Sequence, residues 1–92
     1  MNIYPSGYMP FMIEKKIFLK TLEDVKNFVD VAISKPYDIE LLSGKYIVNA
    51  KSIMGVFSLD LTLPLTMVAN IAEDDQLLSQ IEPYIISSLV TA

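Results

Sequence analysis

The sequence contains no histidine, no cysteine and no arginine among its 92 residues. Without cysteine the chain has neither disulfides nor thiolate ligands for a metal. That composition is typical of a reducing compartment, so we expect a cytoplasmic protein. Without histidine it lacks the commonest general base and the side chain needed for a phosphohistidine. These absences predict a protein that is not an enzyme, has no catalytic residue and holds no cofactor.

Positive charge and long apolar runs are also scarce. Seven lysines stand against eleven acidic residues, which gives a formal net charge of −4. Nucleic-acid binders usually present a basic, arginine-bearing face, so we expect no nucleic-acid binding. No apolar run approaches the roughly 20 residues that cross a bilayer, so we expect no membrane span. The apolar fraction of 52% is high for a small domain and favours an apolar surface for a protein partner.

The chain divides into a short arm and one domain. Residues 1–12 are apolar and aromatic and are interrupted by two prolines and a glycine, without the basic start and continuous apolar run of a secretory signal. We therefore expect an N-terminal arm over residues 1–12 and a single domain over 13–92. Two interpretations of the arm stay open. It is a disordered leader, or Tyr4, Tyr8 or Phe11 pack on the domain or on a second subunit.

The first half of the domain reads as a strand followed by a helix. Residues 13–20 are β-branched and aromatic enough for a half-buried strand. Thr21 then predicts a helix N-cap, with Asp24 in the capping-box position. The apolar residues that follow have helical spacing and predict one buried face. They are Leu22, Val25, Phe28, Val29, Ala32 and Ile33. Pro36 ends the element.

The second half predicts a hairpin, a short helix, a strand and a last helix. Residues 37–42 and 45–50 are strand-like and are separated by Ser43-Gly44, a hairpin signal. A short helix runs from Ser52 to Ser58, and residues 65–71 form the fourth strand. The last helix begins at the acidic residues 73–75 and is kinked or split by Pro83. This β-α-β-β-α-β-α order predicts an α+β two-layer sandwich: a four-stranded, mainly antiparallel sheet with three helices on one face.

One segment, residues 48–59 (VNAKSIMGVFSL), resembles the bacterial phosphocarrier family HPr. The resemblance covers about residues 15–90 and includes the Ser43-Gly44-Lys45 turn. It implies the HPr-like open-faced sandwich and a relation to the phosphoenolpyruvate-dependent sugar phosphotransferase system (PTS) of bacteria. Protein partners would then be PTS or catabolite-control components.

The phosphoryl site of the family is missing from this chain. HPr carries a Gly-x-His-x-Arg-Pro loop between its first strand and first helix, and here the connection is several residues shorter. By alignment from the helix, Leu22 takes the place of the histidine and Asp24 that of the arginine. Leucine has no nucleophile, and Asp24 would repel a phosphoryl donor. The resemblance therefore implies a degenerate site at Leu22 and Asp24.

A second family feature persists at Ser52. The resemblance implies that this serine is a candidate for regulatory phosphorylation, as in the HPr of low-GC Gram-positive bacteria. A phosphate at a helix N-terminus beside Lys51 would be well accommodated. The alternative is that Ser52 only caps its helix, since serine is a preferred N-cap.

The apolar residues after Ser52 are candidates for partner binding. Ile53, Met54 and Phe57, with Lys51, correspond to the surface through which HPr meets its partners, whereas we assign Val56 and Leu59 to the core. The acids 73–75 are expected to start a helix and bind no metal. A Ser-Lys dyad at residues 51–52 is not expected, because adjacent turn residues rarely face one substrate.

Three functional hypotheses remain. The first is a degenerate HPr-like adaptor that binds a protein partner through residues 52–57. The second is a regulator of carbon catabolite control that acts through phosphorylated Ser52. The third is a small structural subunit that self-associates through residues 1–12.

Overall fold

The structure, a computed structural model, describes residues 12–71 and 74–86. Its elements are β1 (Ile13–Ile17), α1 (Leu22–Ile33), β2 (Ile39–Ser43), β3 (Tyr46–Asn49), α2 (Ile53–Phe57), β4 (Leu65–Ala69), α3 (Asp75–Ile81) and the 3-10 helix η1 (Glu82–Tyr84). The predicted order of strands and helices is confirmed. The N-terminal arm, with Tyr4, Tyr8 and Phe11, lies outside the described residues apart from Met12.

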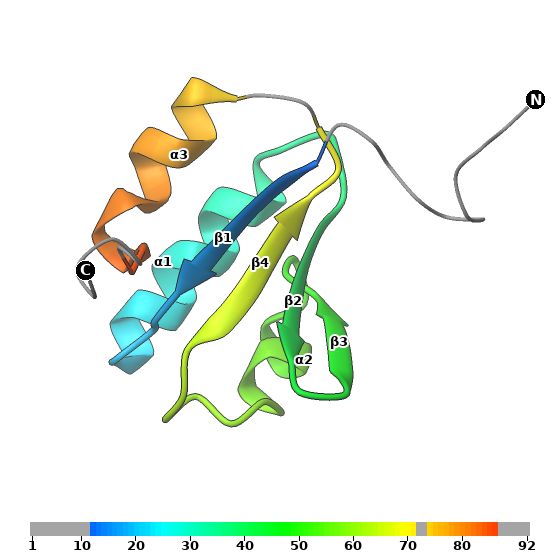
Figure 1. Ribbon diagram of the computed structural model, residues 1–92. Helices are drawn as coiled ribbons and strands as arrows, with labels where there is room; N and C mark the ends of the chain where they lie inside the picture. Colours follow the sequence, from blue (N-terminus) through cyan, green and yellow to red (C-terminus); the bar gives the residue numbers. More distant parts are fainter. Residues whose placement is uncertain (1–11, 72–73, 87–92) are drawn as a thin grey trace, which may run out of the picture.

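The strands form one sheet in the order β1-β4-β2-β3, and every neighbouring pair is antiparallel. Helices α1, α2 and α3 cover one face of this sheet (Figure 1). The predicted α+β two-layer sandwich is therefore confirmed. No helix among residues 12–71 and 74–86 is long and apolar enough to cross a membrane.

The core lies between the sheet and the helices. The central strand β4 presents Leu65, Met67 and Ala69 to it, each at most 1% exposed. From the other layer, Phe28 of α1 sets its ring edge-on against Tyr84, with ring centroids 6.4 Å apart. The other helical residues in this core are Val25, Val29, Ala32, Val56, Leu77 and Ile81.

Two members of the predicted apolar helix face are not buried. Leu22 is 62% exposed and Ile33 is 56% exposed, so placing them on the buried face was wrong. They are the first and last residues of α1 and lie at the margins of its apolar stripe. Side chains on a helix also tilt toward its N-terminus, so Leu22 leans beyond the end of the covered sheet.

The strands are shorter than predicted, because their partners end. β1 stops at Ile17, which pairs with Leu65, the first residue after Pro64, and proline has no N–H to extend the ladder. β4 stops at Ala69 rather than at residue 71, and Asn70 donates instead to the carbonyl of Asp38 at 3.0 Å.

The hairpin turn is displaced by one residue from its predicted place. Ser43 pairs with Tyr46, so the two-residue loop is Gly44-Lys45. Gly44 has φ +59° at the first loop position, and Lys45 does not share this sign, as in a type II′ turn. A glycine is favoured at that position because a Cβ strains the left-handed backbone.

Local signals fixed the ends of the helices well. Thr21 caps α1, with its Oγ1 accepting from the N–H of Asp24 at 3.0 Å. Oδ2 of Asp24 accepts from the N–H of Lys20, one residue before the cap, at 3.1 Å. Pro83 splits the last helical segment, because α3 ends at Ile81 and residues 82–84 form the 3-10 helix.

Candidate functional site

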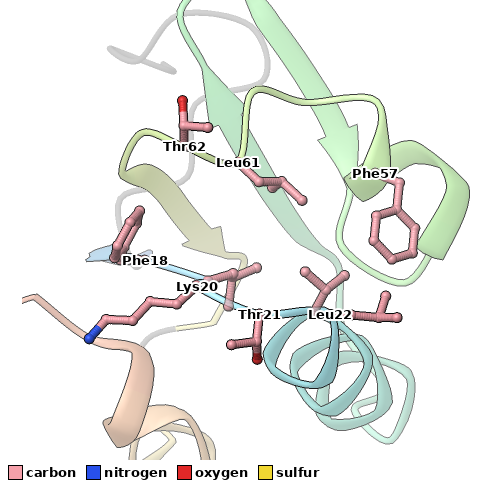
Figure 2. Close-up of a pocket in the computed structure, with 9 residues that line it drawn as sticks. Phe18, Lys20, Thr21, Leu22, Phe57, Leu61 and Thr62 are labelled. Atoms are coloured by element: carbon pink, nitrogen blue, oxygen red, sulfur yellow. The ribbon is translucent and has the colours of Figure 1, made fainter.

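An open apolar groove of about 530 Å³ lies where β1 passes into α1 and where α2 ends. We call it the α1–α2 groove. It is lined by Phe18, Leu19, Lys20, Thr21, Leu22, Val25, Phe57, Leu61 and Thr62. In Figure 2 the side chains of Leu22, Leu61 and Phe57 face a common space, whereas the ammonium group of Lys20 points away from it. The groove therefore joins the two places singled out in the sequence, the altered β1–α1 junction and the turn after Ser52.

Helix α2 presents its apolar residues on two sides. Val56 is fully buried, while Ile53, Met54 and Phe57 are 37%, 77% and 40% exposed. The five-residue helix crosses the edge of the core, so only one position in it points fully inward. The trio is accessible, as the resemblance implied, and its binding of a partner stays a prediction.

Ser52 is the N-cap of α2. Its Oγ accepts from the N–H of Gly55 at 3.1 Å, and the residue is exposed. A Cβ on Gly55 would lie 3.2 Å from that Oγ and 3.5 Å from Cβ of Val48, so the glycine lets α2 approach β3 closely. The predicted cap is confirmed.

Both the side chain and the backbone N–H of Lys51 donate hydrogen bonds within the protein. Its Nζ donates to the carbonyl of Lys35 at 2.7 Å, just beyond the end of α1, and its N–H donates to Oδ1 of Asn49 at 2.8 Å. A lysine in this place interacts favourably with the negative end of the helix. The bond to Lys35 uses one of the three donors of this ammonium group.

The β1–α1 junction carries no histidine to form a phosphohistidine. Leu22 is exposed and apolar, and Asp24 is bound to the backbone of Lys20. Leu22, which is aligned with the histidine, thus lines the groove. Asp24, which is aligned with the arginine, takes part in the hydrogen bonds at the start of α1. Leu22 adds an apolar contact surface to this junction.

A polar cluster that the sequence did not reveal lies beyond the C-terminal end of α1. The hydroxyl of Tyr37 donates to Oδ2 of Asp74 at 2.5 Å, and Nζ of Lys35 lies 3.9 Å from the same oxygen. Asp74 also caps α3 by accepting from the N–H of Leu77 at 3.0 Å. Lys35 is only 7% exposed. The cluster ties the end of α1 and the approach to β2 to the start of α3.

The cluster lowers the pKa of Asp74 and raises the pKa of Tyr37. The hydrogen bond from Tyr37, the bond from the N–H of Leu77 and the charge of Lys35 lower the pKa of Asp74. Burial, the hydrogen bond to Asp74 and the charge of that carboxylate raise the pKa of Tyr37. Asp74 therefore stays ionised and Tyr37 stays protonated over the ordinary pH range.

The lowered pKa of Asp74 predicts a loss of stability in acid. A carboxyl whose folded pKa is below its unfolded pKa contributes stability above the unfolded value, and that contribution is lost as the pH falls through the folded value. We expect the melting temperature to fall less between pH 5 and pH 2 in Asp74→Asn than in the parent protein. Asparagine keeps one oxygen to accept from the N–H of Leu77, and its NH2 replaces the oxygen that faces Tyr37 and can donate to that hydroxyl, but it does not titrate. Equal acid dependence in both proteins would contradict the assignment.

The acidic run before α3 is only partly described. Glu73 lies outside the described residues, and Asp74 is engaged in the cluster above. Among residues 12–71 and 74–86, no three histidine, cysteine or acidic side chains gather as metal ligands would.

Neither the groove nor the cluster follows from a local pattern. Leu22 and Phe57 lie far apart in the sequence, and Tyr37 and Asp74 are separated by 37 positions. The only available signal for the cluster was Asp74 at a helix start. An amphipathic pattern signals burial and so misassigned Leu22, which is one of the residues that line the groove.

Comparison with solved structures identifies the fold. No model of a known protein family matches the sequence, and no curated protein matches it. Among solved structures, HPr-C-His from Thermoanaerobacter tengcongensis has TM-score 0.62 at 23% identity, with 78% of this chain and 86% of that chain covered. The phosphocarrier protein HPr of Bacillus anthracis strain Ames also has TM-score 0.62, at 24% identity, with 82% and 98% covered. The chain therefore has the HPr-like α+β fold.

Proposed function

We propose that this protein is a degenerate HPr-like adaptor that binds a protein partner and carries no phosphohistidine. One observation carries the proposal: Leu22, at the position aligned with the family's histidine, lines the same groove as Phe57 of α2. Loss of phosphoryl transfer alone requires only that the nucleophile be absent. Here its place is taken by an exposed apolar side chain that extends the apolar surface of α2.

The apolar character of the groove indicates the type of contact. Lys20 is the one charged residue lining it, and the exposed Ile53 and Met54 lie on the same helix as Phe57. Clusters of accessible apolar side chains on a small protein are typical of protein interaction sites. The HPr-like fold supports partners among the PTS or catabolite-control proteins, in the cytoplasm of a bacterium.

The experiment is a titration of the 15N-labelled protein with PTS proteins that bind HPr. We expect changes in amide chemical shift to be concentrated at Leu22, Ile53, Met54 and Phe57. We also expect no phosphate to be transferred to the protein in the presence of phosphoenolpyruvate. Shifts confined to other surfaces, or no binding to any of these proteins, would refute it.

A second candidate is regulation through Ser52, favoured by its exposure at the start of α2. Incubation with HPr kinase and ATP tests it: phosphate on Ser52 by mass spectrometry supports the regulator, and its absence leaves Ser52 as a cap. Independently of any kinase, Ser52→Ala should lower the unfolding free energy by about 1 kcal/mol, because the cap to Gly55 is lost. Ser52→Asp retains a capping oxygen and is the matched control in urea denaturation.

A further inference from the structure

The two edge strands of the sheet, β1 and β3, differ in their backbone pairing. Along β1, the N–H of Phe18 donates to the carbonyl of Tyr84 at 2.8 Å, and the N–H of Ile86 donates to the carbonyl of Lys16 at 2.9 Å. Residues 84–86 thus pair with part of this edge. In the part of the chain that the structure describes, β3 at the opposite edge pairs with β2 only.

The open edge is surrounded by accessible apolar side chains. On β3 itself, Tyr46 is 71% exposed and Ile47 is 61% exposed, and because they are consecutive they lie on opposite faces of the sheet. Leu63, in the loop before β4, is 54% exposed. Leu63 and Tyr46 line a second groove of about 540 Å³. The α1–α2 groove has a different set of lining residues.

An exposed edge strand of this kind is a template for pairing with another strand. Natural edges are usually protected by inward charges, prolines or bulges. Residues 46–49 are Tyr-Ile-Val-Asn and contain none of these charges or prolines. Lys45 immediately precedes this strand and lies in the turn.

We propose that β3 pairs antiparallel with β3 of a second copy of this chain and joins two four-stranded sheets into one. The choice of a second copy rests on the chemistry of the strand. Because residues 46–49 are uncharged, self-pairing brings no like charges face to face. A two-fold axis through Ile47 would place Ile47 against its equivalent and Tyr46 against Val48, and aromatic and β-branched cross-strand pairs are favourable.

The available area sets the strength of this dimer. From their exposed fractions, Tyr46, Ile47 and Leu63 offer on the order of 400 Å² per protomer, against about 800 Å² per partner in a standard interface. The association is therefore weak and depends on concentration. It uses a surface other than residues 1–12 and does not depend on the proposed adaptor role.

The test is sedimentation equilibrium of the full chain over a wide concentration range. The parent protein is expected to dimerise as concentration rises, and Ile47→Lys to weaken the dimer at least tenfold, because a lysine on an edge opposes strand pairing. Ile33→Lys is the matched control: it places the same charge at a residue of similar exposure at the end of α1, and it should dimerise like the parent.

Three outcomes would overturn the proposal. They are a parent protein that stays monomeric at all concentrations, an Ile47→Lys variant that dimerises as well as the parent, and an Ile33→Lys variant that dimerises as poorly as Ile47→Lys. Both substitutions are at exposed positions, and circular dichroism of each variant verifies the fold. A further supporting result would be slower amide exchange at residues 46–48 in concentrated than in dilute samples.

Discussion

Replacing Phe57 by alanine is expected to weaken partner binding about 30-fold, equivalent to about 2 kcal/mol, as for an aromatic residue at the centre of an interface. Phe57 lines the α1–α2 groove with Leu22 and is 40% exposed, so part of its ring is available to a partner. Isothermal titration calorimetry with the PTS protein found by the NMR titration gives the two affinities. The expected change is in binding rather than in folding.

The control for this variant is Ile33→Ala. Ile33 is an apolar residue of comparable or greater exposure, 56%, at the far end of α1 from the groove. It should bind as the parent does. Leu22→Lys is a second groove variant, because it introduces a charge into an apolar surface and should also weaken binding. If Phe57→Ala and Leu22→Lys both bind normally while the parent binds, a partner exists but the groove is not its site.

Replacing Phe28 by alanine should destabilise the protein by about 3–5 kcal/mol, the usual cost of a cavity left by a buried aromatic ring. Phe28 is 1% exposed and meets Tyr84 edge-to-face, so its loss removes contacts that join α1 to η1. Small domains are stable by only about 5–15 kcal/mol in total, so this change is a large share. The shift in the urea midpoint at constant m-value measures it.

Phe28→Leu is the matched control, since it keeps most of the volume and should cost less than about 1.5 kcal/mol. If the alanine variant lost no more stability than the leucine variant, the ring of Phe28 would not be a main component of the core. A reduced m-value in the alanine variant would instead indicate that the α3 and η1 segment detaches separately.

Much of the architecture followed from local patterns. The Thr21 and Ser52 caps and the break at Pro83 were placed correctly because each depends on a few neighbouring residues, whereas the hairpin loop was placed one residue too early. Strand ends were less accurate, because a strand ends where its partner does. Pro64, on the partner strand, ends the β1–β4 ladder, and the residues near Ile17 carry no sequence signal for this end.

The candidate site was predictable only in part. The assignment of Val56 and Leu59 to the core is confirmed, and the resemblance to HPr correctly implied exposure of Ile53, Met54 and Phe57. Periodicity misassigned Leu22 and Ile33, because it gives the direction of a side chain and not whether the sheet extends beneath it. The partners of Lys35 and Lys51 had no sequence signal at all.

What the sequence by itself determined is chemical: a chain without histidine forms no phosphohistidine, and one with these caps and periodicities folds as strands and helices in this order. What only the tertiary structure decided is which distant residues meet. It brought Leu22 to Phe57 in one groove, set Tyr37 and Lys35 on Asp74, and left β3 as the open edge of the sheet. The physical reason is that residue types and local propensities act over one or two turns of chain, whereas strand order and the docking of helices depend on the burial of the whole apolar core.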